Sequence, residues 1–195
     1  NALPLAPTVT TPVEYCIGDA TATALTAGGT NLLWYTVATG GTGSTTAPTP
    51  STATVGDTSY YVSQTDGNSC ESLRSEIVVT INALPAVAVN TAQVIDCNNT
   101  SAALDGTGSA TTDVTYAWTT SGTGSFTGAT TGITATAATA GTYTLTVTET
   151  ATGCSDSDSV TVTVEVDTTP PTIDCPEDIV VSNDTDSCDA VVTYV

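Results

Sequence analysis

Histidine, lysine and methionine are absent from this chain of 195 residues, and Arg74 is its only basic side chain. Twenty aspartates and glutamates oppose it, so the formal net charge at pH 7 is -19. Affinity for a phosphate backbone comes largely from lysine and arginine, which release condensed counterions, and attraction to anionic lipids has the same origin. We therefore expect no nucleic acid and no anionic lipid surface as a direct partner.

The side chains that usually act as catalytic bases and nucleophiles are missing as well. Histidine and lysine are unavailable, and cysteines held in disulfides do not attack a substrate. A pair of carboxylates can hydrolyse a glycosidic bond, but the pair needs a groove that holds the sugar between two acids. Small domains with short loops offer no obvious groove. The sequence therefore predicts a protein that is not an enzyme and has no catalytic residues.

Long apolar runs are also missing, because no stretch of 18 consecutive apolar residues occurs. The chain begins at Asn1 without a basic region followed by an apolar one. We expect no direct membrane insertion, and we expect an internal piece of a longer chain whose export and anchoring signals lie elsewhere. Six cysteines without a Cys-x-x-Cys pair favour disulfides over a metal site, and disulfides indicate an extracellular location.

What the sequence does contain is an internal repeat. The residues Asn-Ala-Leu-Pro occur at 1–4 and again at 82–85, and Cys16 and Cys97 are likewise 81 residues apart. A fixed period of this kind is typical of a repeat array. The predicted domains cover residues 1–81, 82–166 and, as an incomplete third, 167–195.

Threonine alternates with apolar residues over much of the chain. At 143–148 one face would carry Tyr, Leu and Val while the other carries only Thr, and residues 160–166 repeat this design after a turn at 151–153. Such alternation predicts an antiparallel hairpin with one buried and one wet face. Related runs lie at 31–36, 59–65 and 76–81, and Gly-rich, Ser-rich and Thr-rich loops are expected at 39–50 and 119–132.

Each repeat also has one tryptophan at a fixed distance from a cysteine. Trp34 precedes Cys70 by 36 residues, and Trp118 precedes Cys154 by the same number. A buried tryptophan beside a disulfide is typical of the immunoglobulin sandwich. The fold class is therefore predicted as all-β, with tandem immunoglobulin-like β-sandwich domains of which the last is truncated. Trp34, Trp118 and Tyr143 are the predicted core aromatic residues.

The cysteines supply one pair to each repeat, and we expect each pair to form a disulfide within its own domain. Cys97 precedes the predicted second strand of its domain, however, and Cys154 follows the last hairpin turn. In the usual immunoglobulin topology those two places lie at opposite ends of the sandwich. Either the strand assignment is displaced, or a cysteine pairs across a domain boundary, for example Cys16 with Cys154.

The segment from residue 167 onward resembles the hyalin repeat (HYR) domain. The residues that carry this resemblance are Asp-Thr-Thr-Pro-Pro-Thr-Ile-Asp-Cys-Pro-Glu-Asp-Ile-Val-Val at 167–181, Asn-Asp at 183–184, Cys188, and Ala-Val-Val-Thr-Tyr at 190–194. About the first third of such a domain is covered. Cys175 can reach Cys188 across a short strand and turn, which predicts a third disulfide.

The two repeats before it resemble the immunoglobulin-like and PKD-like repeats that accompany HYR domains in very large surface proteins of Bacteroidota. The matching residues are Cys16, Trp34-Tyr35, Tyr-Tyr-Val-Ser-Gln at 60–64, Cys70, Cys97, Trp118, Gly-Thr-Tyr at 141–143 and Gly153-Cys154. This resemblance implies a cell-surface adhesin similar to the SprB-type gliding adhesins, which are exported by the type IX secretion system.

The function implied is that of a non-enzymatic repeat segment, a stalk or filament with an adhesive array in surface attachment or gliding motility. Its expected partners are neighbouring modules of the same chain, and surface polysaccharide or other cell-surface proteins. One alternative is that the modules themselves bind carbohydrate or protein through loops such as 39–50. The other is an accessory region of a secreted polysaccharide-degrading enzyme.

Acidic and hydroxyl side chains near the second domain boundary suggest two further hypotheses. Glu165 and Asp167 could hold calcium at the junction, because calcium is bound by six to eight oxygen ligands, although no EF-hand pattern surrounds them. No other cofactor is expected. Ser159 and Thr168 each follow an aspartate in a pattern that resembles the O-glycosylation motif of Bacteroidota, so these two hydroxyls are candidate glycosylation sites.

Overall fold

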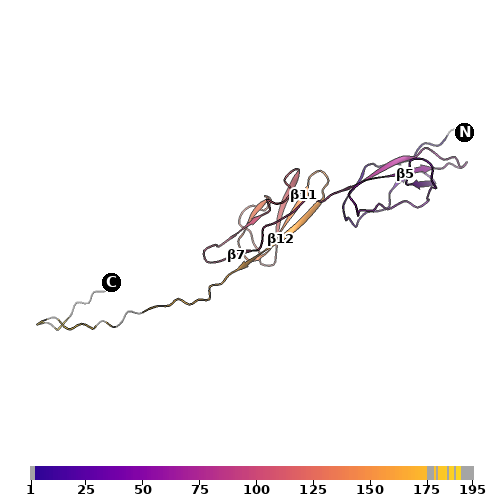
Figure 1. Ribbon diagram of the computed structural model, residues 1–195. Coiled ribbons are helices and arrows are strands. Elements are labelled where there is room, and N and C mark those ends of the chain that lie inside the picture. Colours follow the sequence, from indigo (N-terminus) through magenta and orange to yellow (C-terminus); the bar gives the residue numbers. More distant parts are fainter. Residues whose placement is uncertain (1–2, 175–177, 179, 184, 187, 190–195) are drawn as a thin grey trace. The chain divides into compact units, whose positions relative to one another are not determined.

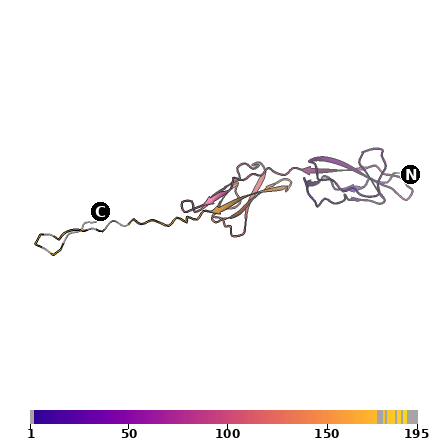
Figure 2. The same ribbon diagram turned by 60° about the horizontal axis from the view of Figure 1, so that its bottom comes forward.

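The computed structural model describes residues 3–174, 178, 180–183, 185, 186, 188 and 189 (Figure 1). Every regular element in these residues is a β-strand, so the fold class is all-β, as predicted. The chain divides into two units, Asn1–Glu165 and Val166–Val195. All of the strands belong to the first unit, which contains two sandwiches (Figures 1 and 2). Within the described part of the chain, no helix has the length and hydropathy of a membrane span.

The first sandwich is built on a four-stranded sheet with the order β2-β6-β5-β4. Strand β2 runs parallel to β6, and the other neighbours are antiparallel. A two-stranded sheet of β1 and β3 packs on the same core through Val9 and Ala27. The strands are β1 (Thr8–Val9), β2 (Val13–Cys16), β3 (Ala27–Gly28), β4 (Leu32–Tyr35), β5 (Gly56–Gln64) and β6 (Ser75–Asn82).

The second sandwich repeats this plan with the sheet order β7-β12-β11-β9. Strand β7 runs parallel to β12, and a two-stranded sheet of β8 and β10 adds Ala102, Leu104 and Ala137 to the core. The strands are β7 (Gln93–Ile95), β8 (Ala102–Asp105), β9 (Val114–Ser121), β10 (Thr134–Ala137), β11 (Gly141–Glu149) and β12 (Ser155–Val164). Both sheets therefore place a short parallel strand beside the last strand of the sandwich, and a tryptophan strand at the other edge.

The predicted hairpin of the second sandwich is the pair β11 and β12, with Tyr143 opposite Val160. Tyr143, Leu145 and Val147 are buried, whereas the threonines between them are not, because successive side chains of a strand point to opposite faces. Two details differ from the prediction. The apolar face of β12 stops being buried after Val162, since Val164 is 53% exposed. Strand β9 also continues to Ser121 and so includes the first residues of the predicted loop 119–132.

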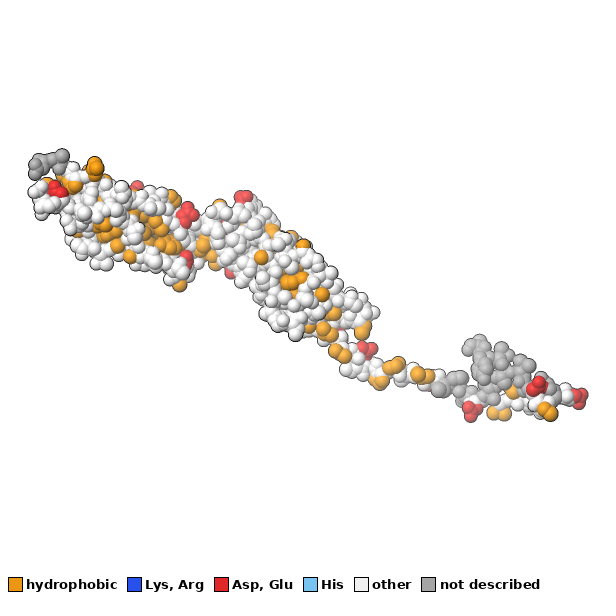
Figure 3. All heavy atoms as spheres, turned by 180° about the vertical axis from the view of Figure 1, so that it is seen from behind, with side chains coloured by type: hydrophobic (Ala, Val, Ile, Leu, Met, Phe, Trp, Pro, Cys, Tyr) orange, Lys and Arg blue, Asp and Glu red, His pale blue; other side chains and the backbone are white. Residues whose placement is uncertain are grey.

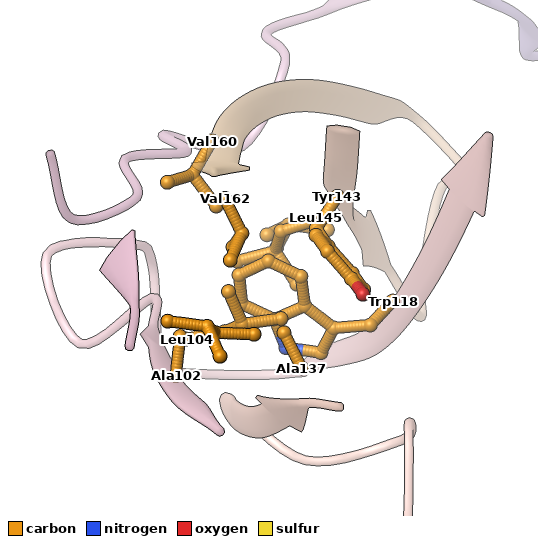
Figure 4. Packing of buried hydrophobic residues seen from close by; sticks show 10 residues of the cluster. Ala102, Leu104, Trp118, Ala137, Tyr143, Leu145, Val160 and Val162 are labelled. Carbon is orange, nitrogen blue, oxygen red and sulfur yellow. The ribbon is translucent and has the colours of Figure 1, made fainter. Parts of the chain in front are cut away.

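The core of the second sandwich surrounds Trp118, which is 3% exposed, and Tyr143, which is fully buried (Figure 4). The ring of Phe126 meets that of Tyr143 edge to face, with centroids 5.0 Å apart. The buried phenol hydroxyl donates a hydrogen bond to the carbonyl of Thr139 at 2.6 Å, so its burial leaves no polar group unpaired. The indole Nε1 of Trp118 is buried without a hydrogen-bond partner among the described residues, which costs about 1–3 kcal/mol.

The core of the first sandwich surrounds Trp34, which is 5% exposed. The side chains packed around it come mainly from one face of the neighbouring strands β5 and β6, and they are Leu25, Val62, Ile77, Val79 and Ile81. Burying one such aliphatic side chain stabilises a fold by about 1.5–3 kcal/mol. Each sandwich therefore has a separate small core with one tryptophan.

Candidate functional site

A disulfide joins the two sandwiches. Cys16 is bonded to Cys154, with the two Cα atoms 5.6 Å apart and a sequence separation of 138. Cys16 is the last residue of β2, and Cys154 lies in the turn just before β12. The expectation that each pair would form within its own domain is therefore wrong for these two cysteines. The alternative pairing across the boundary is the one observed.

The sheet register explains why Cys16 does not pair with Cys70. Cys16 lies opposite Asn82 at the end of β6, because β2 runs parallel to that strand. Cys70 lies before the start of β6, which is 8 residues long. At about 3.3 Å per residue, β6 spans about 25 Å, whereas disulfide-bonded Cα atoms lie less than about 7 Å apart. The two cysteines of a module are thus held at opposite ends of it.

The same arrangement applies to the second sandwich. Strand β7 is level with the end of β12, where Ile95 lies opposite Val164, and Cys97 follows two residues later. Cys154 precedes the first residue of β12. Cys70 and Cys97 are both free thiols, half-buried and exposed respectively. Cys188 is also a free thiol, and it is exposed, so the prediction of a Cys175–Cys188 disulfide is wrong. Cys175 itself lies outside the described residues.

The peptide link between the sandwiches is short. The carbonyl of Asn82 accepts a hydrogen bond from the backbone N–H of Ile17 at 2.9 Å and so still belongs to the first sheet. The carbonyl of Ala86 accepts one from the N–H of Ala110 at 2.9 Å and already belongs to the second sandwich. The residues between them are Ala-Leu-Pro at 83–85. The junction therefore has two covalent connections, this linker and the disulfide.

A second candidate site lies in the first sandwich, where Arg74 fixes the loop that follows β4. Its guanidinium carbon is 3.3 Å from the ring centroid of Tyr35, a cation–π contact. The same guanidinium donates hydrogen bonds to the carbonyls of Val37 at 2.6 Å and Gly40 at 2.7 Å. The only basic side chain of the protein thus holds the loop after β4 in place.

Glu71 completes this cluster from the other side. Its Oε1 accepts hydrogen bonds from the hydroxyls of Ser63 and Tyr35, each at 2.6 Å. The Ser63 bond, then the Tyr35 bond and the positive charge of Arg74 hold the pKa of the Glu71 carboxyl below its usual value. The carboxylate is therefore ionised at neutral pH and orients both hydroxyls.

Beside the cluster, the loop encloses an open groove of about 390 Å³. Its lining is mostly hydroxyl-bearing and aromatic: Trp34, Tyr35, Thr36, Thr42, Ser44, Thr46, Ala47 and Pro48. Pockets for small ligands begin at about 300 Å³. Trp34 and Tyr35 are only 5% and 6% exposed, however, so neither ring offers the open face on which a sugar would stack.

The acidic side chains do not build a metal centre in the part of the chain that the structure describes. No three or more histidine, cysteine, aspartate or glutamate side chains gather there in a way that could hold an ion. Figure 3 shows the carboxylates as separate groups on the face in view. Asp167 accepts the N–H of Thr169 at 2.8 Å, and Glu165 is exposed. Calcium at Glu165 and Asp167 stays a prediction, as does glycosylation at Ser159 and Thr168.

Comparison with known proteins identifies the class of the first sandwich. Residues 4–83 match the family model described as "Ig-like domain CHU_C associated". No curated protein matches the chain. This protein is therefore an all-β protein with an immunoglobulin-like domain at 4–83.

The solved structures that match this chain have low sequence identity to it. They include the PKD domain of the KIAA 1837 protein, with 19% identity and a TM-score of 0.38. That match covers 48% of this chain and 98% of the PKD domain. The fibronectin(III)-like modules of Clostridium thermocellum CbhA have 12% identity and a TM-score of 0.38, with 80% and 90% covered. Drosophila N-cadherin EC1-4 has 15% identity and a TM-score of 0.36, with 84% and 51% covered. This chain thus spans about half the length of that cadherin structure.

Proposed function

We propose that this chain is a non-enzymatic structural segment of an extracellular, cell-surface adhesion protein, in which consecutive sandwiches form a stalk. The observation that carries the proposal is the Cys16–Cys154 bond between consecutive modules. A stalk has to keep its direction and transmit force from one module to the next, and both properties depend on the junctions between modules. A junction with one flexible connection bends and twists freely, whereas a second covalent connection removes most of those movements.

The short linker supports the same function. Three residues separate the last hydrogen-bonded residue of one sandwich from the first of the next, and Pro85, which has a fixed φ angle, is one of them. The net charge of -19 keeps such a segment soluble and makes copies on one surface repel each other. The segment therefore combines restricted junctions with a surface that opposes clumping.

We further propose that the full protein acts in surface attachment or gliding and is exported by a type IX secretion system. The match of residues 4–83 to a CHU_C-associated family model and the resemblance of residues 167–195 to a HYR domain support this proposal. Its test is the cellular location of the protein. A strain that lacks the secretion system should retain the protein inside the cell, whereas unchanged surface display would contradict the assignment.

The stalk function is tested by measuring how freely the two sandwiches move. Cys70 and Cys97 are free thiols, one in each sandwich, and accept spin labels directly once Cys175 and Cys188 are replaced by serine. Pulsed dipolar spectroscopy then gives the distribution of distances between the labels. We expect a narrow distribution in the oxidised chain and a clearly broader one when Cys16 and Cys154 are also replaced by serine.

Equal widths in both samples would contradict the stalk function, because the disulfide would then add nothing to the stiffness of the junction. The tryptophan bands of the near-ultraviolet circular dichroism serve as the control for folding, because the disulfide contributes at shorter wavelengths in that region. These bands should be the same in both samples, since the disulfide lies outside both hydrophobic clusters.

A second candidate function is binding of carbohydrate or protein by the groove beside Arg74. Arg74 holds the loop of this groove in one conformation, so a ligand would not have to order the loop when it binds. The test is adhesion of beads that carry many copies of the chain to polysaccharides, glass and protein-coated surfaces, since multivalent display reveals weak contacts. Binding lost in Thr42→Ala but kept in the exposed control Thr111→Ala would assign it to the groove. If the unmodified chain binds none of these surfaces, only the stalk function remains.

A further inference from the structure

Two cysteine positions recur in both sandwiches, and at each position the two copies share equivalent backbone hydrogen bonds. Cys70 and Cys154 both close the turn before the last strand of the sandwich. The Cys70 carbonyl accepts the N–H of Asp66 at 3.1 Å, and the Cys154 carbonyl accepts the N–H of Glu149 at 2.9 Å. The residue after each cysteine then pairs with the preceding strand, Glu71 with Thr65 and Ser155 with Thr148. Cys70 therefore occupies in the first sandwich the position of Cys154 in the second.

Cys16 and Cys97 form the second equivalent pair of positions, at the other end of each sandwich. Each stands at the end of, or just after, the short strand that runs parallel to the last one. Near both positions a backbone N–H bridges these two strands: Ile17 donates to Asn82, and Glu165 donates to Ile95, at 2.9 Å each. A module of this type thus carries a turn cysteine where the chain enters and an edge-strand cysteine where the chain leaves.

One cysteine of each kind is bonded in this chain, and the bond runs across a junction. The edge-strand cysteine of the first module meets the turn cysteine of the second, Cys16 with Cys154. The two that remain, Cys70 and Cys97, face away from that junction at the outer ends of the two modules, and both are free. Neither can reach the other cysteine of its own module, as the length of the last strands shows.

We propose that Cys70 is a half-cystine of the same kind of junction. Its partner is the edge-strand cysteine of another sandwich of this type, placed directly before the first one in a continuous chain. An array of such modules would then be cross-linked at every junction, each module giving one cysteine forward and one back. This inference does not depend on the stalk function, because it concerns which thiols bond and not what the array does.

The linker sequence gives independent support. The Asn-Ala-Leu-Pro at 82–85, which holds Cys16 and Cys154 within bonding distance, is repeated without change at 1–4 before the first sandwich. A linker of the same length and composition brings a preceding edge-strand cysteine to the same place. Tethering by so short a linker also gives the two thiols a high effective concentration.

The turn that presents Cys70 is already ordered without a partner. Oδ1 of Asp66 accepts hydrogen bonds from the N–H groups of Asn68 at 2.8 Å and Cys70 at 2.9 Å. Forming the bond therefore needs little further ordering. Chemically, the two thiols lose two protons and two electrons as the S–S bond forms. A disulfide oxidant, such as oxidised glutathione, accepts them and leaves as two thiols.

The test adds one module in front of the whole chain. Residues 1–81 are placed directly before residue 1, with the added Cys70 changed to serine, so that the new junction repeats the natural sequence at 81–85. The protein is oxidised in a glutathione buffer, alkylated without denaturant and analysed by peptide mass. In the unextended chain Cys70 should be alkylated fully. In the extended chain its alkylation should fall at least tenfold, while Cys97 is alkylated as before.

The matched control is the same extended chain with Cys16→Ser in the added module only, in which Cys70 should become fully alkylated again. Continued protection in that control would mean burial or pairing within the module and would overturn the proposal. So would a disulfide between two chains, or full alkylation of Cys70 in an extended chain whose added module is folded. The Cys16–Cys154 peptide reports in every sample that the natural junction has folded.

A second extended chain guards against failure of the added module to fold. It carries residues 82–165 before residue 1, with the added Cys154 changed to serine, and the added Cys97 should now protect Cys70. If both extended chains contain the Cys16–Cys154 bond and a folded added module, and Cys70 is still alkylated, the proposal is wrong.

Discussion

Breaking the inter-module disulfide should destabilise both sandwiches and not only one. The perturbation is the double substitution Cys16→Ser and Cys154→Ser. When either module unfolds while the other stays native, the disulfide and the linker tie the two ends of the unfolded segment together. That segment, from Cys16 to the linker or from the linker to Cys154, is a loop of about 70 residues.

The chain-entropy model converts this loop length into a free energy. A cross-link across about 70 residues lowers the entropy of the unfolded chain by about 15 cal/mol/K, which is about 4 kcal/mol at 25 °C. Measured disulfide contributions are typically 2–4 kcal/mol. We therefore expect the free energy of unfolding of each module to fall by about 2–4 kcal/mol in the double variant.

The assay is urea unfolding followed by tryptophan fluorescence, since each sandwich contains one of the two tryptophans. Trp118→Phe leaves Trp34 to report on the first sandwich, and Trp34→Phe leaves Trp118 to report on the second. Each reporter is measured with and without the disulfide, and Cys70→Ser is the control, with an expected change below about 0.5 kcal/mol. A loss confined to one module, or no loss in either, would refute the reasoning.

Three further predictions concern charge and packing. Glu71→Gln should lower the free energy of unfolding at pH 7 by less than about 1 kcal/mol, because the carboxylate is exposed. Since the pKa of Glu71 is lowered in the folded state, its contribution is present above the unfolded pKa and disappears as the pH falls through the folded pKa. Urea unfolding should therefore give the same stability for variant and parent in acid. Raising the ionic strength from about 0.01 to 0.15 M should raise the melting temperature, because it screens the repulsion of the net charge of -19, and an unchanged value would contradict this. Gly106→Ala should cost about 1–3 kcal/mol in urea unfolding, since its Cβ would meet the Leu145 side chain and lie 2.8 Å from the Ile133 carbonyl oxygen; Gly67→Ala, with open space around it, should change little.

The Arg74 cluster shows what residue types alone could not reveal. The sequence indicates that Arg74 is the only basic residue, but nothing in its neighbours signals that it lies over Tyr35 and holds two carbonyls of the loop after β4. These partners are more than thirty residues away in the chain. Loop 39–50 was recognisable as a loop from its composition, whereas its fixation depends on how the strands bring Arg74 beside it.

The sequence by itself determined the all-β class, the repeat and the core positions of Trp34, Trp118 and Tyr143, because alternation and period follow from how strands bury one face. Only the tertiary structure decided which cysteines meet. Spacing along the chain does not say at which end of a strand a cysteine lies. The parallel pairing of β2 with β6 decides at which end Cys16 lies, because it places Cys16 at the end where the chain leaves the module. Cys154 of the next module lies at that same end and forms the bond.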